Sequence, residues 1–128
     1  DLVDLIGWQD MPDQFKSRES HAHNRLLTSV ALTSEERRQV ARTFNERLSR
    51  SKGPVTYLLP THGCNEWDRA GGPLSDPDGL AAFVDETQKT IPENVTLINL
   101  DCHINDPEFC ERALAIFDQW VSAGVIRS

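Results

Sequence analysis

Several features are scarce or absent in this 128-residue sequence. No apolar run approaches the length of a membrane span and no signal peptide is present, so we expect a cytoplasmic protein without a membrane partner. The cysteines number three at irregular spacing, which implies neither a disulfide framework nor a CxxC metal site. Lysine and arginine total 13 against 20 acidic residues, and the net charge of −7 argues against binding DNA.

Two nucleotide-binding fingerprints are also missing. The chain contains neither the P-loop pattern GxxxxGK[ST] nor the dinucleotide pattern GxGxxG. It does not begin with Met, so we expect a piece of a larger protein. What is present has the size and composition of one globular domain, with 38% hydrophobic and 26% charged residues.

Apolar runs and helix signals alternate along the chain. Strands are predicted over residues 1–6, 25–32, 55–59 and 95–100. Thr33 and Glu36 match a capping box, and an Asp-Pro pair at 76–77 and another at 106–107 start two later helices, with the aspartate as the cap. The first helix should bury a stripe made of Val40, Ala41, Phe44 and Leu48.

This order predicts an α/β fold, a three-layer Rossmann-like domain with a mostly parallel sheet. We interpret residues 1–128 as a single domain, with an arm and short strand over 1–24 and βα units over 25–128. Residues 7–24 are predicted to be a loop. We expect the strand at 95–100 to be buried on both faces, with Asn99 hydrogen-bonded or near the sheet edge.

A ligand site is predicted at the carboxyl ends of the parallel strands, where open sheets bind their ligands. The long loop 60–76 and the segment 101–106 meet that description. The predicted ligand-binding residues are His62, Gly63, Arg69, Gly71, Gly72, Asp101, His103 and Asn105. We assign no catalytic residue.

The residue types in this set suggest how each residue would contact a ligand. Glycines let the backbone turn tightly or approach a ligand. Phosphate would use the glycine loop or Arg69, because Asp76 and Asp106 occupy the helix N-termini. We expect Asp101 and His103 to project toward Gly71 and Gly72.

The histidines leave a second interpretation open. His62 and His103 follow strands and belong to the carboxyl edge, whereas His21 and His23 precede a strand and should lie near the opposite edge. We therefore assign no metal site. The alternatives are a metal-assisted hydrolase domain using Asp101, His103 and His62, in which Asp101 orients His103 for acid–base work, and a non-catalytic assembly module.

Three segments carry a resemblance to a known family. They read GPVTYLLPTHGCNEWD at 53–68, GGPLSDPDG at 71–79 and INLDCHINDPEF at 98–109. Together with His23-Asn24, they resemble the Tm-1-like, or UPF0261, family and its Asp-x-His-Ile-Asn-Asp-Pro segment. The match departs from the family pattern at 61–65, where the usual basic residue and serine are replaced.

The resemblance implies the C-terminal lobe of a larger two-lobed, ATP-binding protein, with ATP and Mg²⁺ as cofactors. The partners it implies are the N-terminal lobe of the same family and a TIM-barrel domain. Open edges of a short parallel sheet also favour a homo-oligomer. We expect Trp8, Phe15 and Trp67 to help cover the exposed surface.

Overall fold

The computed structural model describes residues 1–7 and 10–126, so Trp8 lies outside the described residues. The strands are β1 (Leu2–Ile6), β2 (Ser20–Ala22), β3 (Leu27–Ala31), β4 (Val55–Pro60) and β5 (Val95–Leu100). The helices are α1 (Ser34–Ser49), α2 (Pro77–Thr90) and α3 (Pro107–Ser122), with short 3-10 turns η1 (Asp13–Phe15) and η2 (Glu66–Asp68). Within the described ranges, each helix is too short or too polar to cross a membrane.

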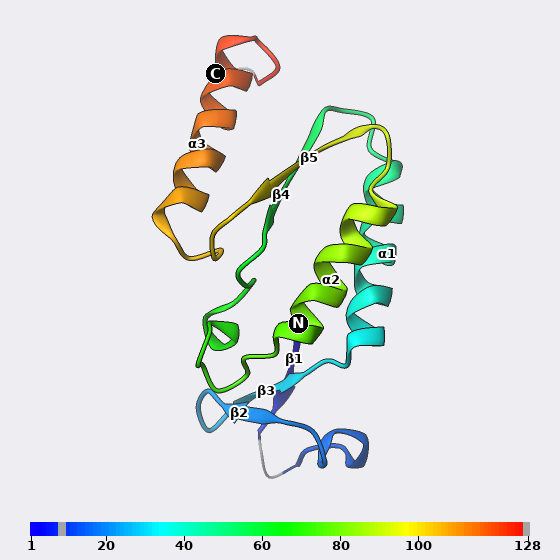
Figure 1. The fold of residues 1–128 in the computed structure, drawn as a ribbon, viewed down its shortest axis with the longest axis vertical. Coiled ribbons are helices and arrows are strands. Elements are labelled where there is room, and N and C mark those ends of the chain that lie inside the picture. The colour runs from blue at the N-terminus through cyan, green and yellow to red at the C-terminus, as the bar shows by residue number, and fades with distance from the viewer. Residues whose placement is uncertain (8–9, 127–128) are drawn as a thin grey trace.

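The strands form two sheets (Figure 1). β4 and β5 pair in parallel, from Val55 opposite Val95 to Pro60 opposite Leu100, which confirms the parallel prediction for this part. The prediction of one mostly parallel sheet is wrong for the N-terminal part, because β1 and β3 pair antiparallel. Parallel strands need a crossover of a dozen or more residues, usually a helix, and no helix of that length lies between β1 and β3. The chain is therefore α/β without a full three-layer Rossmann-like sheet among its described residues.

The segment predicted as a loop over residues 7–24 contains structure of its own. β2 adds to the outer edge of β3, so the N-terminal sheet has the order β1-β3-β2. Ser20 pairs with Val30 and Ala22 pairs with Thr28. A three-residue strand shows almost no period in the sequence, which is why pattern alone missed it.

Helix α1 begins as predicted but buries a different face. Thr33 and Glu36 form the capping box. The buried residues of the helix are Arg37, Ala41 and Asn45. The predicted stripe is wrong at Val40 and Phe44, which are 44% and 47% exposed.

Polar contacts with α2 and its cap explain why α1 buries this face instead of the predicted apolar one. Arg37 is 1% exposed, and its guanidinium donates to Asp76 at 2.9 Å and to the Leu32 carbonyl at 3.0 Å. Asn45 donates to the Thr87 carbonyl at 2.9 Å. Two of these hydrogen bonds join α1 to α2 and its cap, and the third holds Arg37 on the residue before Thr33. Buried polar groups require such partners.

Helices lie on both faces of the parallel pair. A 240 Å³ hollow between α3 and β4 is lined by Thr56 and Leu58 of the strand. The Tyr57 ring lies 5.4 Å from the Phe44 ring of α1, and side chains alternate along a strand. β5 is not buried on both faces as predicted, because Thr96 and Asn99 are exposed. The Asn99 side chain does find a partner, accepting from Gln88 at 3.1 Å.

Candidate functional site

The loops that follow β4 and β5 run side by side beyond the ends of the strands. Thr61 N–H donates to the Leu100 carbonyl at 2.9 Å, and His62 N–H donates to the Cys102 carbonyl at 3.1 Å. One step further, Ile104 N–H donates to the Gly63 carbonyl at 3.1 Å. This extension of the ladder places residues 62–63 against residues 102–104, so the two predicted segments meet.

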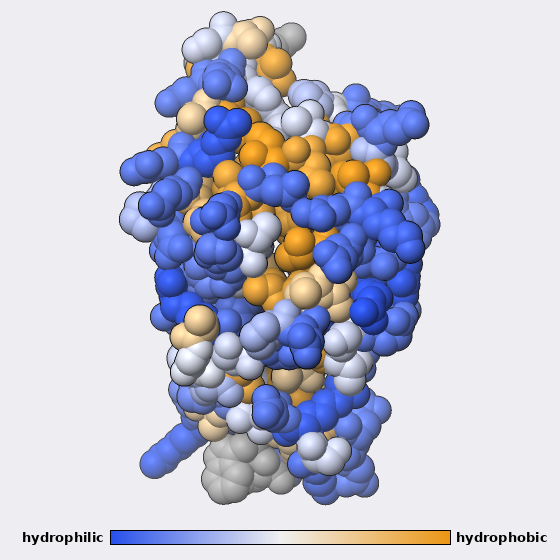
Figure 2. Space-filling view, in the orientation of Figure 1, coloured by the Kyte–Doolittle hydropathy of each residue, from blue (hydrophilic) through white to orange (hydrophobic). Residues whose placement is uncertain are grey.

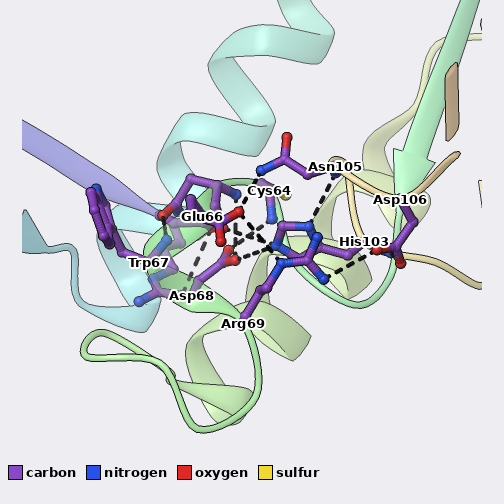
Figure 3. A network of polar contacts seen from close by, with 11 residues as sticks. Cys64, Glu66, Trp67, Asp68, Arg69, His103, Asn105 and Asp106 are labelled. Carbon is purple, nitrogen blue, oxygen red and sulfur yellow. Dashed lines mark hydrogen bonds and ion pairs between the residues drawn. The ribbon is translucent and has the colours of Figure 1, made fainter.

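The centre of the site is a buried pair, Asp68 and His103, which we call the inner pair (Figure 3). Their side chains are 4% and 3% exposed, and His103 Nε2 lies 3.1 Å from Asp68 Oδ1 and 2.9 Å from the Asn65 carbonyl. Asn105 N–H donates to His103 Nδ1 at 3.1 Å. Nδ1 must then be unprotonated, so Nε2 carries the hydrogen and donates to Asp68 and Asn65.

The inner pair also organises the loop around it. Asp68 accepts from Cys64 N–H at 2.7 Å and from Asn65 N–H at 3.4 Å. These bonds fold residues 64–68 over the imidazole of His103. Every polar atom of the ring is engaged, which makes His103 a structural centre and leaves no nitrogen of the ring for a ligand.

Gly63 is required by the inner pair rather than by a ligand. Its φ is +128°, a region that residues with a side chain rarely adopt. A Cβ at this position would meet Asp68 and would lie 2.6 Å from Cδ2 of His103. The close approach predicted for this glycine is therefore an approach to Asp68 and His103.

A second pair, His62 and Asp101, lies at the same edge and is exposed; we call it the outer pair. His62 Nε2 is 2.8 Å from Asp101 Oδ1, with side chains 58% and 95% exposed. The predicted arrangement in which Asp101 orients His103 is thus corrected: Asp101 pairs with His62, while His103 turns toward residues 63–68. Sequence spacing could not distinguish the two histidines, since both follow a strand by two or three residues.

Polar side chains form a belt beside the inner pair (Figure 3). Arg69 contacts Asp106 at 3.1 Å and Glu66 at 3.4 Å, and Asn105 donates to Glu66 at 2.9 Å. The predicted binding residues Arg69 and Asn105 therefore lie together, and both have protein partners. The carboxylates hold the pKa of Arg69 above its ordinary value, Asp106 first through its hydrogen bond.

Asp106 does not cap α3 in the predicted way. Its carboxylate accepts from His103 N–H at 2.8 Å and from Arg69, and no side-chain hydrogen bond reaches the helix. The His103 N–H, followed by Arg69, lowers the pKa of Asp106 below its ordinary value. By contrast, Asp76 caps α2 as predicted, accepting from Gly79 N–H at 2.9 Å.

The glycines at 71 and 72 make a turn. Gly71 has a φ of +79°, and Gly72 N–H donates to the Arg69 carbonyl at 2.7 Å. A Cβ on Gly72 would lie 2.7 Å from the Trp67 carbonyl oxygen. Gly72 is thus required by the packing of its own loop, and the turn directs the chain back toward α2.

Trp67 joins this loop to the N-terminal sheet, a contact that the sequence did not predict. The ring centroids of His21 and His23 lie 4.4 Å and 5.3 Å from that of Trp67. The prediction that these histidines lie at the opposite edge is wrong, because it assumed that β3 belonged to the same parallel sheet. Trp67 was expected to cover the open surface of a parallel sheet, and the structure places it against these two rings beside the antiparallel sheet instead.

A hollow of about 230 Å³ opens between the end of β4 and the start of α2. Its lining residues are Thr61, His62, Asp68, Ala70, Ser75, Asp76, Pro77 and Leu80. His62 of the outer pair and Asp68 of the inner pair both border it. The hollow is thus a place at this edge where a molecule from solution could contact one of the predicted site residues, His62.

Comparisons with known proteins bear on the family. The model of the C-terminal domain of the uncharacterised protein family UPF0261 matches residues 1–121. A UPF0261 protein of Brucella melitensis is 48% identical over 126 residues, which is 98% of this chain and 30% of that protein. A relative from Brucella suis is 47% identical over 98% of this chain, and a relative from Rhizobium meliloti is 29% identical over 91% of this chain. The matched region is 30% of the length of each of these two relatives. The chain spans about 30% of the length of these relatives and belongs to the UPF0261 family, in the region of its C-terminal domain.

Proposed function

We propose that this chain is one lobe of a small-ligand-binding protein and that the ligand contacts the outer pair at the carboxyl ends of β4 and β5. The hollow of about 230 Å³ beside His62 is the observation that carries the proposal. It lies where open parallel sheets bind ligands. The outer pair supplies a carboxylate and an imidazole that face solvent, whereas both ring nitrogens of His103 in the inner pair are engaged within the fold.

A nucleotide is the ligand class that the family resemblance suggests. The outer pair and the hollow beside it, which we call the rim, could contact only part of a nucleotide. The hollow is smaller than the 300–1,000 Å³ typical of small-molecule sites. Arg37 and Arg69, the arginines of this region, are both paired with carboxylates. We propose that contacts to the phosphates of ATP come from the rest of the longer polypeptide, with the exposed Asp101 carboxylate available to a Mg²⁺ ion.

The test is a titration of the whole protein with Mg-ATP. We expect His62→Ala and Asp101→Asn each to weaken binding about tenfold or more, since a hydrogen bond to a charged group contributes roughly 1.5–3 kcal/mol. Asp118→Asn, at an exposed position on α3, is the matched control and should bind like the wild type. Wild-type affinity in both the His62→Ala and the Asp101→Asn variant would refute the proposal that these residues contact the ligand. Absence of Mg-ATP binding by the wild type would refute the proposal that the ligand is a nucleotide.

A hydrolytic role is the second candidate, and the 2.8 Å contact of the outer pair favours it. A carboxylate that orients an accessible imidazole is the arrangement of a general base. His62 would hold this role in place of His103, whose nitrogens are engaged. Release of phosphate, followed in the same titration, should then vanish in His62→Ala. Phosphate release that persists in this variant would exclude the role.

We also propose that the outer face of α1 packs against the remainder of the longer polypeptide. A 430 Å³ hollow on this face is lined by Leu32, Glu36, Gln39, Val40, Thr43, Phe44 and Arg47. Apolar side chains also gather on the surface near β4 and β5, between α3 and α2 (Figure 2). Relatives have about 70% of their length outside this region, which supports a partner within the same polypeptide rather than a second copy.

Cysteine labelling tests this face. In a Cys110→Ser background, Val40→Cys should react quickly in the 128-residue chain and slowly in the whole protein. Leu114→Cys on α3 is the exposed control. Equal labelling of Val40→Cys in both would refute the contact, and protection that grows with concentration of the short chain would identify a homo-oligomer instead.

A further inference from the structure

A second group of donor atoms shares Asp68 with the inner pair. It consists of the Asp1 and Asp68 carboxylates and the Cys64 thiol, and one donor atom from each lies within 4.8 Å of the others. Two segments supply them: the residue before β1, and the loop after β4, which contains η2. A hollow of about 330 Å³ bordered by Asp1, Cys64 and Asn65 opens beside the group.

One carboxylate oxygen of this group has no hydrogen-bond partner among the described residues. The Asp1 side chain is 3% exposed, and within the described part of the chain its Oδ1 accepts no hydrogen bond. Arg37 Nη1 is 3.8 Å away, which gives attraction without a hydrogen bond. A buried carboxylate oxygen without a donor is costly, so native structures usually pair it or place it on a metal ion.

We propose that Asp1, Cys64 and Asp68 bind one divalent transition-metal ion of the Zn²⁺ type. Thiolate and carboxylate are both ligands that Zn²⁺ accepts, and a thiolate disfavours Mg²⁺ and Ca²⁺. Three protein ligands leave a fourth position open toward the hollow, for water or a bound molecule. This site is separate from the outer pair and does not depend on the proposed ligand of the rim.

The surroundings suit such an ion in charge and in orientation. The carboxylates of Asp1 and Asp68 carry negative charge that a dication would balance, because the nearby Arg37 is already paired with Asp76 at 2.9 Å. His103 Nε2 and Cys64 N–H both donate to Asp68, so its carboxylate is held in place by neighbours in the way that outer partners hold metal ligands.

Titration of the metal-free whole protein with Co²⁺ tests the proposal, because a thiolate ligand gives a sulfur-to-cobalt charge-transfer band. We expect one equivalent of Co²⁺ to produce the band in the wild type and in Cys110→Ser, the exposed control cysteine. Cys64→Ser should abolish the band, and Asp1→Asn should weaken Co²⁺ binding about tenfold or more. Zn²⁺ should displace the Co²⁺ and remove the band.

Three results would overturn the proposal. They are absence of the band in the folded wild type, persistence of the full band in Cys64→Ser, and equal loss in Cys110→Ser. Circular dichroism of each variant shows whether it folds. If Cys64→Ser does not fold, the Co²⁺ affinity of Asp1→Asn tests the proposal instead. Unchanged Co²⁺ affinity in Asp1→Asn would then refute the metal site.

Discussion

The inner pair, Asp68 and His103, and the outer pair, His62 and Asp101, contain the same two residue types at the same edge of the β4–β5 sheet. The N···O distances are similar, 3.1 Å and 2.8 Å. Their surroundings differ: the inner side chains are 4% and 3% exposed, whereas His62 and Asp101 are 58% and 95% exposed. The inner pair has further hydrogen bonds to four backbone groups around it.

This difference separates a role in folding from a role in binding. A buried carboxylate with several donors stabilises only while all its partners remain, since each orphaned polar group is costly. An exposed ion pair contributes at most about 1 kcal/mol and can exchange its partner for a ligand. Chemical type alone therefore says little about function here, and burial decides it.

Replacing Asp68 should have the largest effect on stability. Asp68→Ala leaves the N–H groups of Cys64 and Asn65 without an acceptor and removes one of the two acceptors of the His103 ring. We expect a loss of roughly 3–5 kcal/mol in the free energy of unfolding, measured by urea denaturation. Asp101→Ala is the matched control, and a similar loss in this variant would erase the distinction between the two pairs.

Gly63→Ala should be the next most harmful change. The methyl group would occupy space taken by Asp68 and His103, and φ would remain strained at +128°. The expected cost is roughly 2–3 kcal/mol in the free energy of unfolding. Gly53→Ala is the control, because nothing lies within 4 Å of its Cβ position. Equal stability of the two alanine variants would show that residues 63, 68 and 103 are less tightly packed than described.

Asp106→Asn should have a smaller effect that depends on pH. The folded state lowers the pKa of Asp106 below its ordinary value of 3.8, chiefly through the His103 N–H and then through Arg69. The charged carboxylate therefore stabilises the fold above the unfolded pKa, and this contribution is lost as pH falls through the folded value. The stability advantage of the wild type should be full at pH 6 and shrink below pH 4 in thermal melts. An advantage that stays constant over this range would mean that the charge of Asp106 contributes nothing.

Much of this edge could be predicted from the sequence because it follows from local rules. Apolar runs located β4 and β5, and Thr33 and Asp76 capped their helices as their positions indicated. The parallel pairing of β4 with β5 followed from the helix between them. These features each depend on a few neighbouring residues.

The rest depends on contacts between distant residues, which a local pattern does not contain. In the sequence, His62 and His103 each follow a strand by two or three residues and so look equivalent. Only the fold shows that His103 is buried and His62 is exposed. Asp68 was noted in the family pattern but not as a site residue, because its partner is 35 positions away. The buried face of α1 was missed because Arg37 and Asn45, both polar, lie in it.

The most direct test of this account compares the unfolding of His103→Ala and His62→Ala in urea under identical conditions. The central claim is that the inner pair belongs to the fold and the outer pair to the ligand. His103→Ala should lose about 2–4 kcal/mol, since it removes a buried ring, takes one donor from Asp68 and leaves the Asn105 N–H without its acceptor. His62→Ala should change stability by less than about 0.5 kcal/mol. Equal losses in the two variants, or a larger loss in His62→Ala, would contradict the account.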